Sequence, residues 1–168
     1  MNLLKKQSVA WIITIALVIA AVGIGCSKGG APKTPQQDAV SCVWDDAQVL
    51  SDRTVRTLDD RNDRLWNRYS VTIGVVTCNY NRDDLYEYAM EQFEEMGLGS
   101  YDMIVVLDIR GDNYWLYTGN DVAWDFSDQD CMDYTYSYME NWFARGNYDN
   151  AVLDLTEALE AWYRSYYN

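Results

Sequence analysis

The chain contains no histidine among its 168 residues. This absence excludes Ser-His-Asp and Cys-His nucleophile systems, and it excludes zinc sites built with histidine ligands. Glycine-rich loops with the spacing of Walker or dinucleotide-binding motifs are also missing. The side chains left for chemistry are carboxylates, cysteine, tyrosine and arginine, with a carboxylate-bound metal as a further option.

Positive charge is scarce and unevenly placed. All four lysines lie before residue 34, and the rest of the chain sets nine arginines against all 26 aspartates and glutamates. Nucleic acids and anionic lipid headgroups need a basic surface, so neither is expected as a partner of residues 38–168. Two interpretations of the acidic surface stand equal at this point: it provides solubility, or it recruits cations.

The N-terminus resembles an export signal. Lys5 and Lys6 precede an apolar run from Val9 to Gly25 that is interrupted by Thr14 alone. The run is near the lower limit for crossing a bilayer and is long for a cleavable segment. Three interpretations follow: an uncleaved signal-anchor helix, which we favour, a lipoprotein signal with Cys26 as the lipidated residue, or an ordinary cleaved signal.

The remainder of the chain divides into a linker and one domain. Residues 1–26 form the signal segment, and residues 27–39 are rich in Gly, Pro, Lys and Gln, as in flexible linkers. Residues 40–168 have the usual length of one domain with one core. Each interpretation of the signal places this domain on the extracytoplasmic side, tethered to the membrane by a helix or a lipid in the first two.

Hydrophobic periodicity and capping residues predict alternating helices and strands in this domain. Helices are expected over about 52–69, 84–96, 128–145 and 148–167. Ser51 and Ser127 are the predicted caps of the first and third helices, and Asp83 and Asp84 are expected to open the second. Buried strands are expected at 71–78 and 103–109, and a third strand at 114–118 forms a hairpin with the second. This order predicts an α/β fold, a three-layer α/β/α sandwich with a small mixed central sheet.

The helical stripes predict which side chains face the core. In the 52–69 helix the apolar face contains Val55, Leu58, Leu65, Trp66 and Tyr69. The other face is expected to be solvated; its arginines are Arg53, Arg56, Arg61, Arg64 and Arg68. In the 128–145 helix the predicted inward stripe is Cys131, Tyr134, Tyr138 and Trp142.

Several short segments occur in a recognisable order. They are Val43-Trp-Asp-Asp-Ala-Gln-Val-Leu-Ser51, Val71–Thr77, Gly97-Leu-Gly99, Ile104–Leu107, Tyr117-Thr-Gly119 and Gly146-Asn-Tyr148. Together they resemble the TPM-domain family, which comprises thylakoid-lumen proteins similar to acid phosphatases and bacterial cell-envelope proteins. The resemblance implies the same α/β/α arrangement. The chain departs from the family at Thr118-Gly119-Asn120-Asp121, where a second glycine is usual.

A metal site of carboxylates is the sharpest hypothesis for chemistry. Sites in open α/β sheets form beyond the carboxyl ends of the strands, and Ca²⁺ takes six to eight oxygen ligands. Position along the chain and the TPM resemblance together select Asp45, Asp46, Asp102, Asp121 and Asp128 as candidate ligands of Ca²⁺ or Mg²⁺. The alternative is that Asp121 and Asp128 are turn and cap residues, where aspartate is favoured on backbone grounds.

Cysteines of exported proteins tend to form disulfides. With Cys26 reserved for the membrane segment and Cys78 at the end of a buried strand, a bridge between Cys42 and Cys131 is the preferred pairing. A catalytic thiol would need a basic neighbour to lower its pKa, and the acidic domain offers few.

Two classes of function remain. The first is a cell-envelope binding or assembly module with an envelope protein as partner, and the second is a metal-dependent phosphatase-like hydrolase that uses the acidic cluster. The domain is rich in aromatics, and some of them lie off the inward stripes: Trp124, Tyr136, Tyr163 and Tyr167. Exposed Trp and Tyr can stack on sugars or anchor a protein partner. Because the chain offers few cations beyond some arginines to hold a phosphate, we rank the binding module first.

The export signal predicts that residues 38–168 lie outside the cytoplasmic membrane. Protease added to intact spheroplasts should therefore degrade the domain. Protection of the domain until the cells are lysed would contradict this topology.

Overall fold

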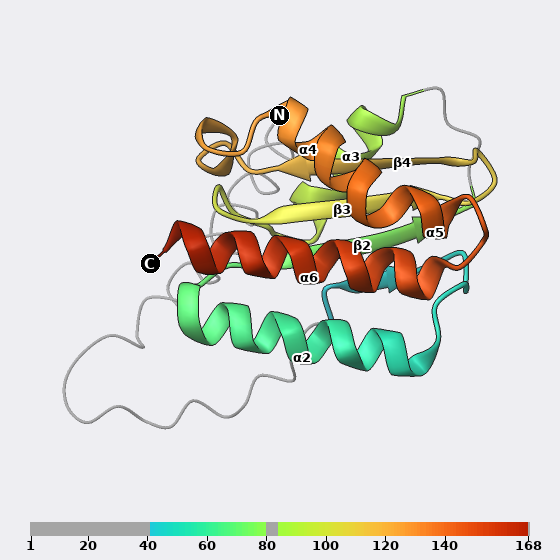
Figure 1. The fold of residues 1–168 in the computed structure, drawn as a ribbon, viewed down its shortest axis with the longest axis horizontal. Coiled ribbons are helices and arrows are strands. Elements are labelled where there is room, and N and C mark those ends of the chain that lie inside the picture. Colours follow the sequence, from blue (N-terminus) through green and yellow to red (C-terminus); the bar gives the residue numbers. More distant parts are fainter. Residues whose placement is uncertain (1–40, 80–83, 168) are drawn as a thin grey trace, which may run out of the picture. The chain divides into compact units, whose positions relative to one another are not determined.

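The computed structural model describes residues 41–79 and 84–167. The predicted signal segment, the linker and Cys26 lie outside these residues. Among the described residues, no helix is both long enough and apolar enough to span a bilayer. The fold is mixed α/β, with a four-stranded sheet and helices on both of its faces (Figure 1).

The sheet has its strands in the order in which they occur along the chain. The strands are β1 (Val43–Asp45), β2 (Ile73–Cys78), β3 (Met103–Asp108) and β4 (Asn113–Thr118). The first three strands are parallel, and β4 returns antiparallel to β3. The two buried strands and the hairpin predicted from the sequence are confirmed, whereas β1 was not predicted as a strand.

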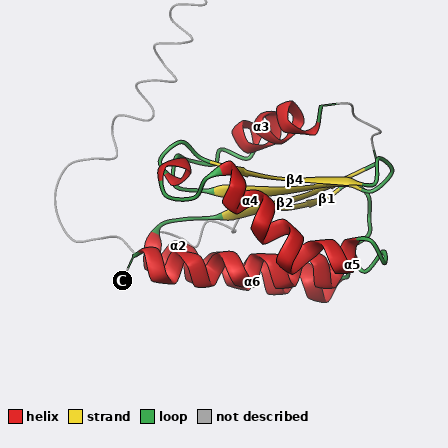
Figure 2. Cartoon of the chain, turned by 45° about the horizontal axis from the view of Figure 1, so that its top comes forward, coloured by secondary structure: helices red, strands yellow, loops and turns green. Residues whose placement is uncertain are grey.

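The helices divide between the two faces. They are α2 (Asp52–Tyr69), α3 (Leu85–Glu95), α4 (Asp128–Tyr134), the π-helical segment η2 (Thr135–Glu140), α5 (Asn141–Phe143), α6 (Tyr148–Tyr166) and the short 3₁₀ turn η1 (Val122–Trp124). Figure 2 shows α3 alone on one side of the sheet and α2, α4, α5 and α6 on the other. This agrees with the predicted placement of helices on both faces.

Helices α2 and α3 each connect two adjacent parallel strands, and both connections advance in the same direction across the sheet. Right-handed crossovers that advance in one direction place their helices on one face. Because α2 and α3 lie on opposite faces, the two connections have opposite hands. One of them departs from the right-handed rule.

The hydrophobic core is split by the sheet into two unequal parts. On the larger side, alternate residues of the strands, such as Val75 and Val105, pack with Leu58 of α2 and Leu155 of α6. On the smaller side, the intervening residues, such as Val106, pack against α3. Strand side chains alternate between the two faces, and since helices cover both, β2 and β3 are apolar throughout.

Side-chain caps set the starts of the helices. The Ser51 hydroxyl accepts from the Thr54 N–H at 3.2 Å, and the Asp84 carboxylate accepts from the Glu87 N–H at 3.1 Å. At α4, Ser127 forms a full capping box with Asp130. The caps predicted at Ser51, Asp84 and Ser127 are therefore confirmed. Ser and Asp are favoured at these positions because their side-chain oxygens accept from the first free N–H groups of the helix.

For two side chains of α2 the predicted burial is wrong. Trp66 was predicted to face the core and is 60% exposed, while Arg61 was predicted to be solvated and is 7% exposed. The Arg61 guanidinium donates to the Leu153 carbonyl at 3.0 Å and to the Thr156 hydroxyl. It also bonds the Glu160 carboxylate at 3.1 Å. The contact between α2 and α6 is therefore made partly by a buried ion pair, which hydrophobic periodicity cannot reveal.

The predicted stripe of the 128–145 segment is confirmed only in part: Cys131 is buried, Tyr134 and Trp142 are half-buried against the core, and Tyr138 is exposed. The buried residues are Cys131, Thr135, Met139 and Phe143, whereas Tyr138 is exposed. A row spaced by four residues drifts around a regular α-helix, which has 3.6 residues per turn. The wider turns of η2 offset that drift and keep this row against the sheet.

The buried position of Arg61 leads to a stability prediction. Arg61→Ala removes a buried guanidinium together with its bonds to Glu160, Thr156 and the Leu153 carbonyl, so it should lower the free energy of unfolding by about 3–5 kcal/mol. Arg64→Ala is the matched control, because the Arg64 side chain is 58% exposed; its loss should stay below about 1 kcal/mol. Chemical denaturation of the two variants measures the difference, and equal losses would contradict it.

Candidate functional site

Asp45 lies at the carboxyl end of β1 and organises the loop that follows. Its Oδ1 accepts from the Val49 N–H at 3.1 Å and its Oδ2 from the Leu50 N–H at 3.0 Å. The Thr77 hydroxyl on the neighbouring strand donates to Oδ1 at 2.5 Å and accepts from the Ala47 N–H at 3.2 Å. Both carboxylate oxygens of Asp45 thus accept hydrogen bonds from the protein itself, and these bonds hold the loop after β1 in place.

Asp102 has the same character at the opposite end of the sheet, just before β3. Its two oxygens accept from the Thr72 and Gly99 N–H groups, each at 2.6 Å. Burial raises the pKa of this carboxyl, and these two bonds act in the other direction. Asp102 ties the start of β2 to the loop after α3.

The remaining predicted ligands do not join either aspartate in one cluster. Asp121 accepts from the Ser100 hydroxyl at 2.5 Å, at the amino end of the parallel strands with Asp102. Asp46 is exposed beside Asp45, and Asp128 is exposed at the start of α4. No group of three or more Cys, Asp or Glu that could hold a metal occurs within 41–79 and 84–167.

The direction of β4 explains this separation. The prediction placed the loop after β4 beyond the carboxyl ends of the strands, together with Asp45. Because β4 is antiparallel, its own carboxyl end lies at the amino ends of β2 and β3. The structure therefore places Asp102 and Asp121 at one end of the sheet and Asp45 and Asp46 at the other, and it does not bring the five carboxylates together.

The predicted disulfide partners also lie apart. Cys42 directly precedes β1, and its carbonyl accepts from the Val75 N–H at 2.9 Å. Cys131 packs beside β4, at the opposite edge of the sheet, and is a thiol in the structure. Since the four strands separate the two residues, this fold does not form a Cys42–Cys131 bridge. Burial, followed by the charges of Asp128 and Asp130, raises the pKa of the Cys131 thiol to about 12.

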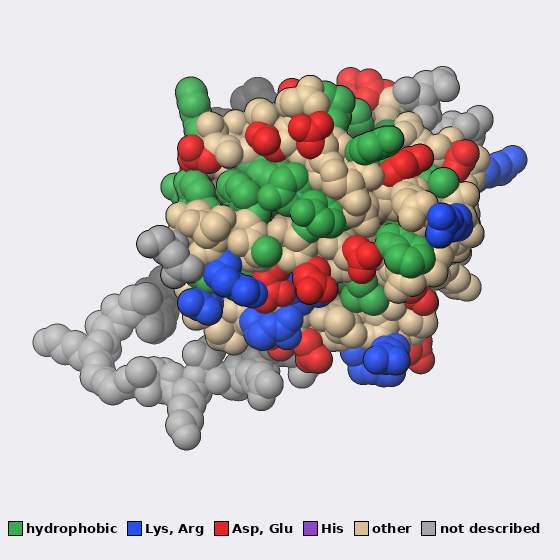
Figure 3. Space-filling model, in the orientation of Figure 1, with side chains coloured by type: hydrophobic (Ala, Val, Ile, Leu, Met, Phe, Trp, Pro, Cys, Tyr) green, Lys and Arg blue, Asp and Glu red, His purple; other side chains and the backbone are tan. Residues whose placement is uncertain are grey.

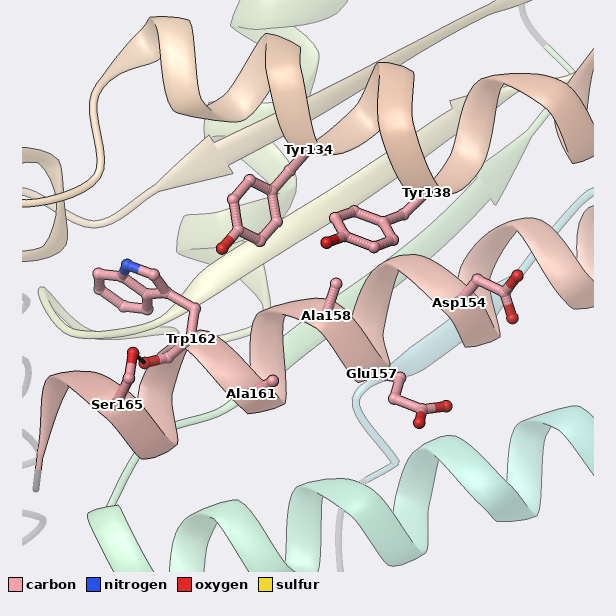
Figure 4. Close-up of a pocket in the computed structure, with 8 residues that line it drawn as sticks. All are labelled: Tyr134, Tyr138, Asp154, Glu157, Ala158, Ala161, Trp162 and Ser165. Carbon is pink, nitrogen blue, oxygen red and sulfur yellow. Dashed lines mark hydrogen bonds between the residues drawn. The ribbon is translucent and has the colours of Figure 1, made fainter.

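An open groove lies between the α4–η2 segment and α6, with a volume of about 540 Å³. Figure 4 shows Tyr134 and Tyr138 extending toward α6 from above, with Trp162 at one end. Asp154 and Glu157 lie at the other end. In Figure 3, hydrophobic side chains gather over this region of the surface. We call this feature the aromatic groove.

The groove exists because small residues on α6 lie opposite the large aromatic residues of α4 and η2. Its floor on α6 is formed by Ala158, Ala161 and Ser165, which share one face of the helix through spacings of three, four and seven residues. The wall is held by ring contacts: Phe126 lies 4.9 Å from Tyr134 and 5.0 Å from Trp162 between ring centroids. Rings packed edge to face in this way are stiff, so the wall is preformed.

The electrostatics of the aromatic groove are acidic. Its described lining contains the carboxylates of Asp154 and Glu157 and no arginine or lysine. The Trp142 indole N–H donates to Asp154 at 2.7 Å and fixes it in place, whereas the Glu157 side chain is 77% exposed. Burial, helped by the neighbouring Tyr138 hydroxyl, raises the pKa of Tyr134, which keeps that hydroxyl neutral. The groove is therefore suited to apolar groups that carry positive charge.

The succession of β1, α2, β2, α3 and the β3–β4 hairpin can now be compared with known proteins. The family model of the TPM domain matches residues 43–162. The chain belongs to the TPM-domain family. The family resemblance read from the ordered segments of the sequence is confirmed. Comparison with curated protein sequences gives no match.

Several solved structures share the fold at low sequence identity. The N-terminal domain of a P. gingivalis protein is 20% identical with a TM-score of 0.67, covering 74% of this chain and 83% of that one. The N-terminal domain of a Corynebacterium glutamicum protein is 15% identical with a TM-score of 0.60, covering 80% and 86%. A protein from Bizionia argentinensis is 17% identical with a TM-score of 0.57, covering 70% and 83%. At these identities the likeness concerns the fold alone.

Sequence reasoning missed the residues that shape the groove. Tyr134 and Tyr138 were assigned to the core, and Ala158 and Ala161 were not considered. Among the off-stripe aromatics, Trp124 is 86% exposed as expected, but Tyr163 is fully buried. The spacing of small residues on the 148–167 helix was the available signal, since small side chains opposite large ones leave space between helices.

The raised pKa of Cys131 predicts an inert thiol. At pH 8 its thiolate fraction in the folded protein should be roughly a thousandfold below that of a free cysteine, and iodoacetamide reacts with the thiolate. Alkylation of Cys131, followed by peptide mass spectrometry, should be slow in buffer and fast in guanidinium. Asp128→Asn should speed it only slightly, because burial is the larger cause. Rapid labelling of the folded protein would contradict the prediction.

Proposed function

We propose that this TPM domain is a non-catalytic binding module of the cell envelope, held at the membrane by residues 1–26. Its partner is an envelope protein that inserts a basic segment with apolar flanks into the aromatic groove. The single observation that carries the proposal is the composition of the groove: Tyr134, Tyr138 and Trp162 beside Glu157 and Asp154, with no cation in the described lining.

The physical argument rests on what each group offers a ligand. Tyrosine faces attract cations, and tyrosine and tryptophan supply contact area at little cost in conformational entropy. The Glu157 carboxylate lies 3.8 Å from the Arg61 guanidinium, but its side chain is 77% exposed, so it can also pair with a lysine or arginine of the partner. The excess of acidic residues over the whole domain would attract a basic segment to the domain, and the carboxylates of Asp154 and Glu157 would favour its binding in the groove.

The hydrolase interpretation finds less support in the geometry. Both carboxylate oxygens of Asp45 and of Asp102 already accept hydrogen bonds from the protein. The two residues also lie at opposite ends of the sheet. The five predicted aspartates cannot all bind one Ca²⁺ or Mg²⁺ ion, because they lie at two opposite ends of the sheet. We therefore assign no reaction step to these residues.

Photo-crosslinking from the groove tests the binding function. A benzoylphenylalanine at Ala161, on the groove floor, should crosslink an envelope protein in cells that express the full chain. Glu157→Lys should reduce the yield roughly tenfold, which is the effect of about 1.4 kcal/mol. Glu91→Lys is the matched control, because Glu91 is exposed on α3 across the sheet; it should leave the yield unchanged.

Two outcomes would overturn the proposal. One is a crosslinking yield that responds equally to both charge reversals, because the groove would then have no special role. The other is hydrolysis of p-nitrophenyl phosphate by the purified full chain that requires Ca²⁺ or Mg²⁺, stops with chelator and is lost in Asp45→Asn. That result would establish the phosphatase alternative instead.

A further inference from the structure

The outer edge of β4 is an unpaired strand edge in the described part of the chain. Its six residues, Asn-Tyr-Trp-Leu-Tyr-Thr, include no charge and no proline. Proteins usually blunt such edges with lysine, proline, a bulge or a very short strand, because open backbone groups recruit other strands. The other edge strand, β1, follows this practice: it has three residues and ends in Asp45.

The ladder between β3 and β4 shows which backbone groups are open. The Gly119 N–H donates to the Asp102 carbonyl at 2.9 Å, and these residues are directly opposed in the register. Bonded and non-bonded pairs alternate in an antiparallel ladder. Trp115 and Tyr117 therefore bond β3, and the N–H and C=O groups of Leu116 and Thr118 point away from it.

A groove of about 310 Å³ runs beside this edge. One wall is the strand, with Tyr114, Trp115 and Leu116, and the other is the helical segment, with Cys131, Met132 and Thr135. We call this feature the β4 groove. Met132 is 56% exposed and Trp115 is 39% exposed, so both present apolar surface to whatever enters. Strand and helix thus flank an apolar space that lies along the open edge of β4.

Charge determines which strand would enter. Asp128 lines the β4 groove on the α4 side. On the α3 side, the charge of Glu94 reaches Tyr117 and, after burial and Tyr86, contributes to the raised pKa of that phenol. No lysine or arginine appears in the described lining. A second copy of this acidic domain is therefore a poor occupant, and a segment carrying lysine or arginine is a good one.

We propose that the β4 edge binds an extended, basic peptide segment of a partner protein, which adds as a fifth strand of the sheet. Backbone bonds to Leu116 and Thr118 supply the pairing, and one apolar side chain of the peptide fills the space beside Met132. Alternate side chains of the peptide carry the positive charge on the α3 side. This surface is separate from the aromatic groove, and the inference does not depend on the function proposed for that groove.

A designed peptide tests this inference on the full chain in detergent micelles. The probe is a fluorescein-labelled octapeptide of alternating lysine and valine, and binding is measured by fluorescence anisotropy. Two further probes have N-methyl groups at the odd or at the even residues, with unchanged charge. Because an added strand bonds β4 through alternate residues only, one of the two should lose binding and the other should keep it.

Two protein variants locate the site. Met132→Lys places a charge in the β4 groove and should weaken binding roughly tenfold. Tyr136→Lys is the matched control, because Tyr136 is 74% exposed outside the groove lining; it should have little effect. Hydrogen exchange at the Leu116 and Thr118 amides should slow when the octapeptide is bound. Glu157→Lys should leave this binding intact, which separates it from the aromatic groove.

Three results would overturn the inference. Equal binding of both N-methylated probes would mean that charge attraction alone holds the peptide. Absence of binding at millimolar peptide would mean that the edge is closed. Protection of the Leu116 and Thr118 amides without peptide, together with a dimer in sedimentation analysis, would mean that a second copy occupies the edge.

Discussion

The return of β4 against β3 is the constraint on which most of this structure depends. A fourth parallel strand would have left its following loop at the carboxyl ends of the parallel strands, which is the end of the sheet where Asp45 lies. The antiparallel return instead sends residues 119–127 to the other end of the sheet, where Gly119 packs so closely on Ser100 that an added Cβ would lie 2.5 Å from the Ser100 carbonyl oxygen. From that end α4 begins beyond the last strand and crosses back over the face (Figure 1). Both the aromatic groove and the β4 groove lie along this crossing segment.

The aspartates illustrate how the same side chain serves structure rather than metal binding. Asp45 and Asp102 sit at strand ends, where backbone N–H groups of the adjoining loops would otherwise lack partners. Each carboxylate satisfies two such groups, which stabilises the loop and uses the oxygens that a cation would need. Asp84 and Ser127 likewise accept hydrogen bonds from backbone N–H groups in the first turns of their helices. An acidic sequence therefore supplies many oxygens without assembling a site from them.

The contact between α2 and α6 depends on a buried arginine, which the hydrophobic pattern of the sequence does not reveal. Arg61 is buried because Glu160, Thr156 and the Leu153 carbonyl of the parallel helix meet it, and a buried charge persists only where such partners are already in place. Arg53 and Arg64 lie on the same helix, and both side chains are exposed. The difference lies in the neighbouring helix.

Local information in the sequence was sufficient for the family and for most of the elements, although not for β1. Continuous apolar runs identified β2 and β3, and Ser51, Asp84 and Ser127 marked helix starts, because a strand buried on both faces and a cap each depend on residues close in the chain. The order of short segments identified the TPM domain. The predicted hairpin already implied the direction of β4, which the choice of Asp121 as a ligand beside Asp45 did not take into account. The tertiary structure alone decided the faces on which α2 and α3 lie, the burial of Arg61 and the phase of the 128–145 segment. Each of these depends on contacts between residues far apart in the chain. Because a functional surface is assembled from such contacts, its position had to come from the fold.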